Sequence, residues 1–208
     1  MIQPLRRPGA AFTLEADGDQ KNPAQRGIVA EKLGISSDWA TVRQVHGRCV
    51  VEVAGPGHLE GGADGLFTRT VGLPVAVMAA DCAGVVVGGD KGVGVAHAGW
   101  RGVAAGVVTS LLGTMRSGGV EPTWAAVGPF IGPCCFEVGP DVSRRFPSQR
   151  ATSRRGRLSV DLGRALAEQL RDVPTWWSER CTVHQPGCFS HRRDRALKRM
   201  AAIGWFSP

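Results

Sequence analysis

The stretch LPVAVMAADCAGVVVGGDKGVGVAHAGWRG, residues 73–102, decides the fold because it contains three short apolar runs in succession. Glycine-rich segments separate the runs, and GGDKG, between the second and third, is typical of a hairpin turn. The runs are apolar on both faces, so we expect the sheet that they form to be covered on both sides. The stretch therefore predicts buried strands at the centre of the molecule.

The segments before this stretch predict a helix and two strands. NPAQRGIVAEKLGI predicts a helix over residues 23–33, with Asn22 as the N-cap and Gly34 as the stop. WATVRQVHGRCVVEVA is rich in β-branched residues and predicts a strand, an interruption at His46-Gly47 and a second strand.

The segments after it continue the alternation of helices and strands. Apolar residues recur at helical spacing from Val103 to Met115. A further helix is expected from about Gly139 to Phe146, and RLSVDLGRALAEQL predicts a short strand that enters a helix. Because strands and helices intermix throughout, we predict a single α/β domain.

Length and composition limit the class of protein. The chain has 208 residues, of which 43% are hydrophobic, enough for a real core. No apolar run reaches the roughly 18 to 20 residues that a membrane span requires, so we expect no membrane association. The N-terminus MIQPLRRPGAAF has no apolar core typical of a signal peptide, and we expect a cytoplasmic protein.

The positive charge is concentrated near the C-terminus. The formal net charge is +7, and residues 144–208 hold 14 Lys or Arg against 5 Asp or Glu. A basic segment of this kind can attract phosphate-bearing ligands or nucleic acid. No RNA-recognition, zinc-finger or helix-turn-helix signature accompanies it, so we expect no nucleic-acid partner.

The six cysteines predict thiol chemistry or metal binding rather than disulfides. The chain is large and shows no export signal, which favours reduced thiols. Cys134 and Cys135 are adjacent, and a bond between neighbours would be strained. CTVHQPGC, residues 181–188, offers at most three ligands in a short loop, and we expect no second metal site there.

Three residues stand out by position as well as type. His46, Cys82 and His97 each lie where an apolar segment gives way to a polar, glycine-flanked site. If neighbouring strands end at one edge, these side chains converge. Two imidazoles and a thiolate form a competent catalytic zinc set, with a fourth position open to water or substrate. Ala98 and Gly99 would leave room for the metal and its ligand.

Other interpretations of the same residues stay open. His97 can be a buried, hydrogen-bonded core residue, and Cys82 a small hydrophobic one. Cys82 can also be the nucleophile of a cysteine hydrolase, with His46 or His97 as its base. A His₂Cys set can bind copper, but five histidines are too few for a multicopper oxidase.

Several motifs together resemble one family. They are RQVHG, ADG, ADC, HAGWRG, GPFIGPCCFEVG and CFSHRRD, and they extend the resemblance from about Phe12 to Trp205. The chain resembles the YfiH family, whose members have been described as multicopper polyphenol oxidases (laccases) and more recently as purine nucleoside phosphorylases. The resemblance implies one catalytic domain over residues 1–208, with mixed β-sheets flanked by helices.

The resemblance also implies a zinc site at His46, Cys82 and His97, with copper as the less favoured metal. The implied reaction is phosphorolysis of adenosine or inosine, with adenosine deamination and methylthioadenosine phosphorolysis as side activities. The implied partners are a purine nucleoside and phosphate, and we expect a monomer or homodimer.

Charge and position suggest roles for further residues. Arg101, next to the proposed ligands, is expected to grip phosphate in catalysis, because a guanidinium can bind two phosphate oxygens at once. Asp81 is expected to be catalytic and Gln44 to bind substrate, because both lie near proposed ligands and could orient substrate or metal ligands. Additional phosphate or substrate contacts are expected from the arginines Arg26, Arg192 and Arg193.

Overall fold

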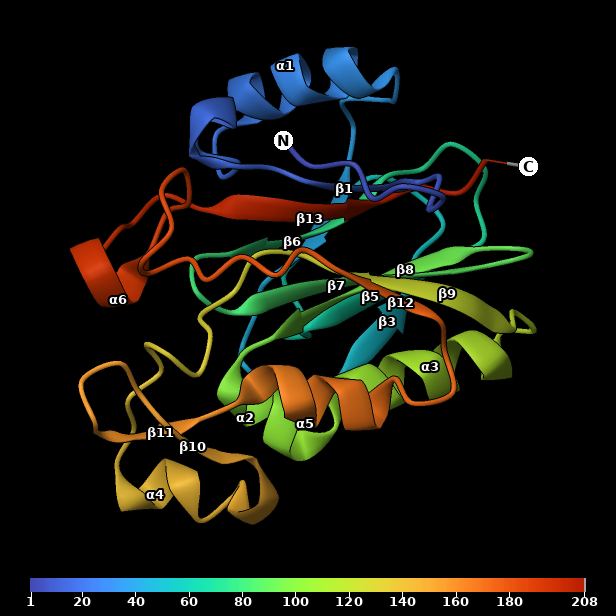
Figure 1. The fold of residues 1–208 in the computed structure, drawn as a ribbon. Helices are drawn as coiled ribbons and strands as arrows, with labels where there is room; N and C mark the ends of the chain where they lie inside the picture. Colours follow the sequence, from blue (N-terminus) through green and yellow to red (C-terminus); the bar gives the residue numbers. More distant parts are fainter. Residues whose placement is uncertain (208) are drawn as a thin grey trace.

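The computed structural model describes residues 1–207 and arranges them as two facing β-sheets with helices on both outer faces (Figure 1). Helix α1 (Pro23–Leu33) covers the outer face of one sheet. The outer face of the other sheet is covered by α2 (Trp100–Ala105), α3 (Val107–Ser117) and α5 (Leu162–Gln169). The predicted α/β fold, with mixed sheets flanked by helices, is confirmed.

Both large sheets contain parallel and antiparallel pairs. The five-stranded sheet has the order β1 (Ala10–Phe12), β13 (Met200–Gly204), β6 (Val75–Ala79), β2 (Ala40–Val42) and β4 (Gly57–Leu59). The six-stranded sheet has the order β12 (Thr175–Trp177), β9 (Pro122–Val127), β7 (Ala83–Gly89), β8 (Val93–Ala98), β5 (Gly65–Thr68) and β3 (Val50–Glu52). A separate hairpin is formed by β10 (Arg150–Thr152) and β11 (Leu158–Val160).

The three apolar runs of residues 73–102 do not share one sheet, and this part of the prediction is wrong. The first run is β6 in the five-stranded sheet, whereas the second and third form the β7–β8 hairpin of the six-stranded sheet. The chain changes sheets through a sharp turn at Asp81, whose φ is 81°. Each run is apolar on both faces because each sheet is covered by the other sheet on one side and by helices on the other.

Residue alternation along β7 divides the core into its two layers. Val86 points toward the other sheet, where Val77 and Ala202 belong to the same apolar cluster. Val85 and Val87 belong to the cluster that contains α3 and α5. A strand with a period of two residues is thus buried on both sides.

The helices agree with the sequence-based predictions except at two places: a break at Gly106, and a helix α4 that is shorter than expected. Helix α1 begins after Asn22, whose side chain accepts a hydrogen bond from the backbone N–H of Ala24, and it ends at Gly34, as predicted. The helical spacing from Val103 onward is interrupted at Gly106, which has a left-handed conformation and separates α2 from α3. Helix α4 covers only Pro140–Ser143, and α6 covers His191–Asp194. Within residues 1–207, no helix is both long and apolar enough to cross a membrane.

The break at Gly106 predicts opposite effects for two Gly→Ala substitutions. Gly106 has a φ of 81°, where a Cβ costs roughly 1–2 kcal/mol. Gly113 lies inside α3 with open space around it, where alanine stabilises a helix by roughly 0.5–1 kcal/mol. Thermal unfolding of the two variants should therefore show Gly106→Ala melting below the wild type and Gly113→Ala above it. The same direction of shift in both would contradict the left-handed break.

Candidate metal centre and cavity

Three separate segments bring His46, Cys82 and His97 together. His46 follows β2, Cys82 lies in the turn between β6 and β7, and His97 is near the end of β8. One ligand atom from each residue lies within 4.8 Å of the others. The two imidazole rings meet edge to face, with their centroids 4.8 Å apart. The predicted convergence of these side chains is thus present, although the strands that carry them belong to different sheets.

A carboxylate that the sequence interpretation left without a role, Asp64, holds both histidines. It is completely buried, and its Oδ1 accepts hydrogen bonds from the His46 backbone N–H at 2.9 Å and from His97 Nδ1 at 2.8 Å. Its Oδ2 accepts from the backbone N–H groups of Val45 at 3.2 Å and Gly47 at 2.6 Å. These bonds support a turn in which His46 has a φ of 61°. They leave Nε2 of His97 to face Cys82.

Neighbouring charges control ionisation in this cluster. Burial disfavours the thiolate of Cys82, but hydrogen bonds from His46 and His97 outweigh it and lower its pKa from 9.0 to about 6. Burial also disfavours the imidazolium of His97, but hydrogen bonds to Asp64 and Cys82 raise its pKa to about 9. The surroundings favour a thiolate beside a positive charge, which a proton or a metal ion can supply.

Gly99 keeps the space beside the cluster open. A Cβ at this position would lie 3.0 Å from Cys82 Sγ and 3.0 Å from Cδ2 of His46. Both contacts are tighter than ordinary van der Waals distance. This position therefore supports the expectation that a small residue leaves room next to the three side chains.

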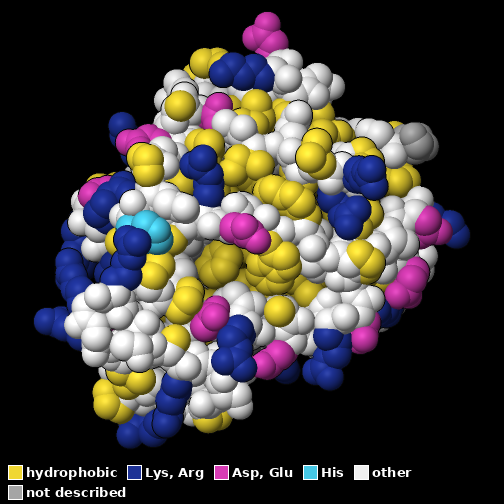
Figure 2. All heavy atoms as spheres, in the orientation of Figure 1, with side chains coloured by type: hydrophobic (Ala, Val, Ile, Leu, Met, Phe, Trp, Pro, Cys, Tyr) yellow, Lys and Arg dark blue, Asp and Glu magenta, His cyan; other side chains and the backbone are white. Residues whose placement is uncertain are grey.

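The cluster lies at a cavity of about 580 Å³, a size suited to a small-molecule ligand. Its lining contains apolar side chains, including Met78, Ile131 and Phe136. The lining also contains four cationic or titratable side chains: Lys21, His191, Arg192 and Arg199. Figure 2 shows that Lys and Arg side chains gather on the side of the molecule that carries α4, α6 and the β10–β11 hairpin.

Asp81 and Gln44 also line the cavity, and both are bound to neighbouring structure. The Asp81 carboxylate accepts hydrogen bonds from the hydroxyls of Thr182 at 2.6 Å and Ser190 at 2.7 Å and from the Arg192 backbone N–H at 2.6 Å. The Gln44 amide donates to the carbonyl of Met78 and accepts from its N–H, both at 2.7 Å. Both residues thus fasten segments of the cavity wall.

The arginines expected at the site divide into two groups. Arg192 lines the cavity, with Nη1 donating to the Glu137 carbonyl at 2.9 Å. Arg101 stacks on Trp100 and lies in another hollow, and α2 begins one residue before it. Arg26 lies on α1 in a separate depression. The guanidinium of Arg193 is occupied by Asp194 and by backbone carbonyls. Three of these four arginines are therefore not brought to the cavity.

Four functional candidates were absent from the predicted set. Asp64 belongs to the ADG motif, directly after a glycine-rich loop, and this position was the signal in the sequence that could have identified it. His191 belongs to the CFSHRRD motif, next to the expected Arg192, whereas Lys21 and Arg199 come from opposite ends of the chain and no local pattern connects them to the cavity.

The α/β fold, with a Cys–His₂ group at a cavity of ligand size, is typical of a protein that binds a metal ion and a small molecule at one site. The family model described as "Multi-copper polyphenol oxidoreductase laccase" matches residues 12–207, and the chain belongs to this family. The resemblance to YfiH proteins is also confirmed by individual relatives.

Curated relatives have consistent names. A purine nucleoside phosphorylase of Xylella fastidiosa (strain 9a5c) is 36% identical over 201 residues, covering 86% of this chain and 76% of the relative. The purine nucleoside phosphorylase YfiH of Escherichia coli (strain K12) is 33% identical over 193 residues, covering 87% of this chain and 78% of the relative.

Solved structures have the same fold. YlmD from Geobacillus stearothermophilus is 29% identical, with a TM-score of 0.79 over 89% of this chain and 80% of that one. The hypothetical protein YfiH of Bacillus licheniformis is 25% identical, with a TM-score of 0.81 over 95% of this chain and 92% of that one.

The contacts of Asp64 predict that Asp64→Asn weakens metal binding. An amide that keeps its oxygen toward His97 turns its NH₂ toward the N–H groups of Val45 and Gly47, which leaves buried donors unpaired. We expect roughly a 10–100-fold loss of zinc affinity and about 1–3 kcal/mol of stability, measured by chelator competition and thermal unfolding.

Asp90→Asn is the matched control, since Asp90 is half exposed beside Lys91 in the β7–β8 turn. It should leave both quantities unchanged. Equal zinc affinity in Asp64→Asn and in the control would contradict the role given to Asp64.

Proposed function

We propose that this protein is a zinc-containing purine nucleoside phosphorylase and that residues 1–208 form one catalytic domain. The observation that carries the proposal is the His46–Cys82–His97 cluster at a cavity lined by both cationic and apolar side chains. The names of relatives that match over most of the chain support the same reaction. The proposed substrates are adenosine or inosine with phosphate. Adenosine deamination and methylthioadenosine phosphorolysis are proposed as side activities.

The donor set fits zinc. Two imidazole nitrogens and one thiolate are typical ligands, and three protein ligands leave one coordination position free. His97 would bind through Nε2, because Asp64 accepts from Nδ1 and fixes that tautomer. Gly99 leaves the required space. A bound zinc ion would supply Lewis acidity toward a substrate oxygen at this edge of the cavity.

The cationic side chains of the cavity form the proposed phosphate site. Arg192 and Arg199 each have part of the guanidinium bonded to backbone carbonyls, which fixes its position. Lys21 and His191 add further donors to the same cavity. Fixed guanidinium groups bind phosphate oxygens in pairs and so hold the nucleophile in position.

The apolar side chains of the cavity form the proposed purine site. Phe136 offers a ring beside Ile131 and Met78, and Arg192 lies 5.5 Å from the centre of that ring. Phe136 and its apolar neighbours would hold a purine base by stacking and apolar contact. In phosphorolysis a phosphate oxygen bonds to C1′ of the ribose while the bond from C1′ to the base breaks, and the leaving base takes up a proton. Asp81 would hold Arg192 in place, because its carboxylate accepts a hydrogen bond from the backbone N–H of Arg192.

A hydrolase with Cys82 as its nucleophile is the second candidate function, because Asp64, His97 and Cys82 also form a chain of hydrogen-bonded groups. Such a chain activates a thiolate nucleophile without metal. Copper is the second candidate for the metal, since His₂Cys sites also bind copper. The phosphorylase requires the metal ion and phosphate, whereas the cysteine hydrolase requires neither.

The test is a product assay with inosine and with adenosine on zinc-loaded protein. We expect release of the free base only with phosphate, formation of ribose 1-phosphate, and loss of activity on chelation that zinc restores. Arg199→Gln should raise the KM for phosphate about 10–100-fold, because a hydrogen bond to a charged group contributes about 1.5–3 kcal/mol. Chromatography of the bases and a coupled phosphate assay give these quantities.

Arg116→Gln is the control, because Arg116 is exposed on α3 and pairs with Glu121. It should retain the wild-type KM. A larger effect from Arg101→Gln than from Arg199→Gln would instead locate phosphate near α2. Activity that survives chelation but is lost on alkylation of Cys82 would overturn the proposal in favour of a cysteine hydrolase.

A further inference from the structure

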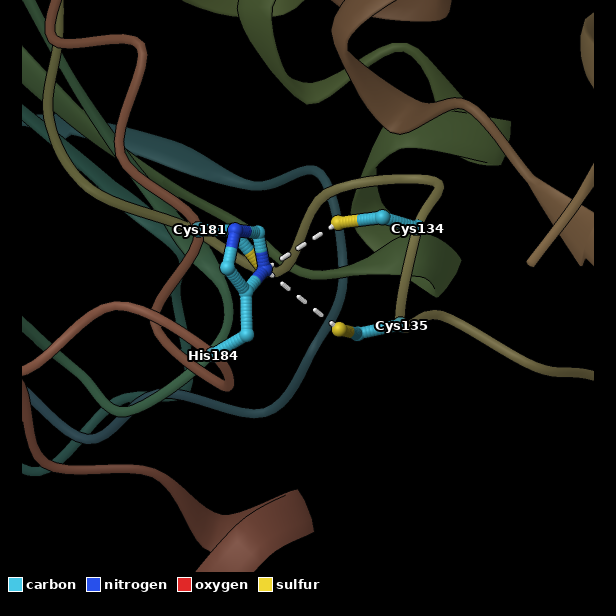
Figure 3. A group of neighbouring side chains, drawn as sticks. All are labelled: Cys134, Cys135, Cys181 and His184. Atoms are coloured by element: carbon cyan, nitrogen blue, oxygen red, sulfur yellow. Dashed lines mark hydrogen bonds between the residues drawn. The ribbon is translucent and has the colours of Figure 1, made fainter. Parts of the chain in front are cut away.

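A second group of metal-binding side chains lies outside the cavity (Figure 3). Cys134 and Cys135 lie in the loop between β9 and α4, and Cys181 and His184 lie in the segment between β12 and α6. Figure 3 shows the three thiols and the imidazole turned toward one another from these two segments. The expectation of no second metal site in CTVHQPGC considered that loop alone, whereas the fold places Cys134 and Cys135 beside its Cys181 and His184.

The distances within this group fit a tetrahedral zinc site. Nδ1 of His184 lies 3.4 Å from Sγ of Cys134 and 3.6 Å from Sγ of Cys135. All four ligand atoms lie within 4.8 Å of one another. Zn–S bonds of about 2.3 Å and Zn–N bonds of about 2.0–2.1 Å, at tetrahedral angles, separate sulfur from nitrogen by about 3.6 Å and sulfur from sulfur by about 3.8 Å.

The surrounding backbone supports these ligand positions. The N–H of Gly132 donates to Sγ of Cys181 at 3.3 Å, which suits a thiolate. A Cβ on Gly132 would approach Sγ of Cys134 to 3.3 Å, so a larger residue would crowd the group. The side chain of Gln185 accepts from the N–H of Cys181 at 2.7 Å, and the N–H of Arg154 donates to the carbonyl of Cys134 at 3.0 Å. The bonds of Gln185 and Arg154 thus hold the backbone of both cysteine segments and leave the sulfur atoms available to a metal ion.

We propose that Cys134, Cys135, Cys181 and His184 bind a structural zinc ion, a second metal site of this chain. Three thiols and a neutral imidazole fill a closed tetrahedral shell, the pattern of structural zinc. On binding, each thiol releases its proton to solvent and no electrons are transferred. The resulting site has one net negative charge, and Arg192 lies beside it with Nη1 3.4 Å from the Cys135 carbonyl.

The second metal would join two parts of the cavity wall. Ile131 and Phe136, which line the cavity, flank Cys134 and Cys135. Thr182, which lies between Cys181 and His184, donates its hydroxyl hydrogen bond to Asp81. A zinc ion at this point therefore fixes the loop that carries Phe136 relative to the segment that leads to Arg192.

Metal analysis of the full chain tests the proposal, with all readouts independent of activity. After expression with zinc and gel filtration, we expect two zinc ions per chain in the wild type. Cys181→Ser and His184→Gln should each retain about one, and their melting temperatures should fall by roughly 5–10 °C. His184 is exposed, so His184→Gln provides the test if the buried Cys181→Ser does not fold.

Cys49→Ser is the matched control, because Cys49 is an exposed free cysteine that belongs to neither group. It should retain two zinc ions, whereas Cys82→Ser should lose the zinc of the cavity and keep that of the second group. With cobalt in place of zinc, sulfur-to-metal absorption should fall by about three quarters in Cys181→Ser, because three of four ligand thiolates belong to this site.

Two results would overturn the proposal. One is a wild-type zinc content that Cys181→Ser and His184→Gln leave unchanged. The other is an intact mass, measured without reductant, that shows a disulfide among Cys134, Cys135 and Cys181 in protein purified with zinc. A wild-type protein that holds zinc only at the second group, with none at His46, Cys82 and His97, would contradict the proposed function and leave the second site standing.

Discussion

The buried carboxylate of Asp64 is the interaction on which the rest of the site depends. Its two carboxylate oxygens accept four hydrogen bonds, three from backbone N–H groups around His46 and one from the ring of His97. A charged group without exposed surface is favourable only when its lone pairs are satisfied in this way. The same bonds stabilise the left-handed backbone of His46 and orient His97 toward Cys82. One residue thus couples a turn of the five-stranded sheet to a strand of the six-stranded sheet.

The facing sheets explain why the cavity lies where it does. The chain leaves β6 in one sheet and enters β7 in the other at Asp81-Cys82, and this crossing exposes Cys82 at the edge between the sheets. Asp81 then binds the hydroxyls of Thr182 and Ser190, which closes the C-terminal segment over the same edge. The two cysteine–histidine groups differ accordingly. The three-residue group lines the cavity, whereas the four-residue group does not line it and is formed by two loops, one of which carries Ile131 and Phe136 of the lining.

Local signals in the sequence were sufficient for much of the fold. Asn22 and Gly34 delimit α1 because capping depends on a few neighbouring residues. The GGDKG turn fixes the β7–β8 hairpin for the same reason. The assignment of β6 to a different sheet was missed, because a strand buried on both faces has the same apolar pattern in either sheet. The break at Gly106 was missed because apolar spacing continues across it.

The candidate site was predictable only in part. His46, Cys82 and His97 each follow an apolar run, and that shared feature identified them. Arg101 was expected at the cavity because it is near His97 in sequence, yet its guanidinium turns to Trp100. Arg199 and Lys21 reach the cavity through tertiary contacts that no short motif records. The pairing of Cys134 and Cys135 with Cys181 and His184 likewise depends on two loops that only the fold brings together.

Anomalous X-ray diffraction at the zinc edge, on crystals of zinc-loaded protein, tests the central claim most directly. The account predicts a peak about 2.3 Å from Sγ of Cys82 and about 2.0–2.1 Å from one nitrogen each of His46 and His97. His97 should bind through Nε2 while its Nδ1 still donates to Asp64. Electron density with no anomalous peak among these three residues, and with Cys82 hydrogen-bonded directly to His97, would contradict it.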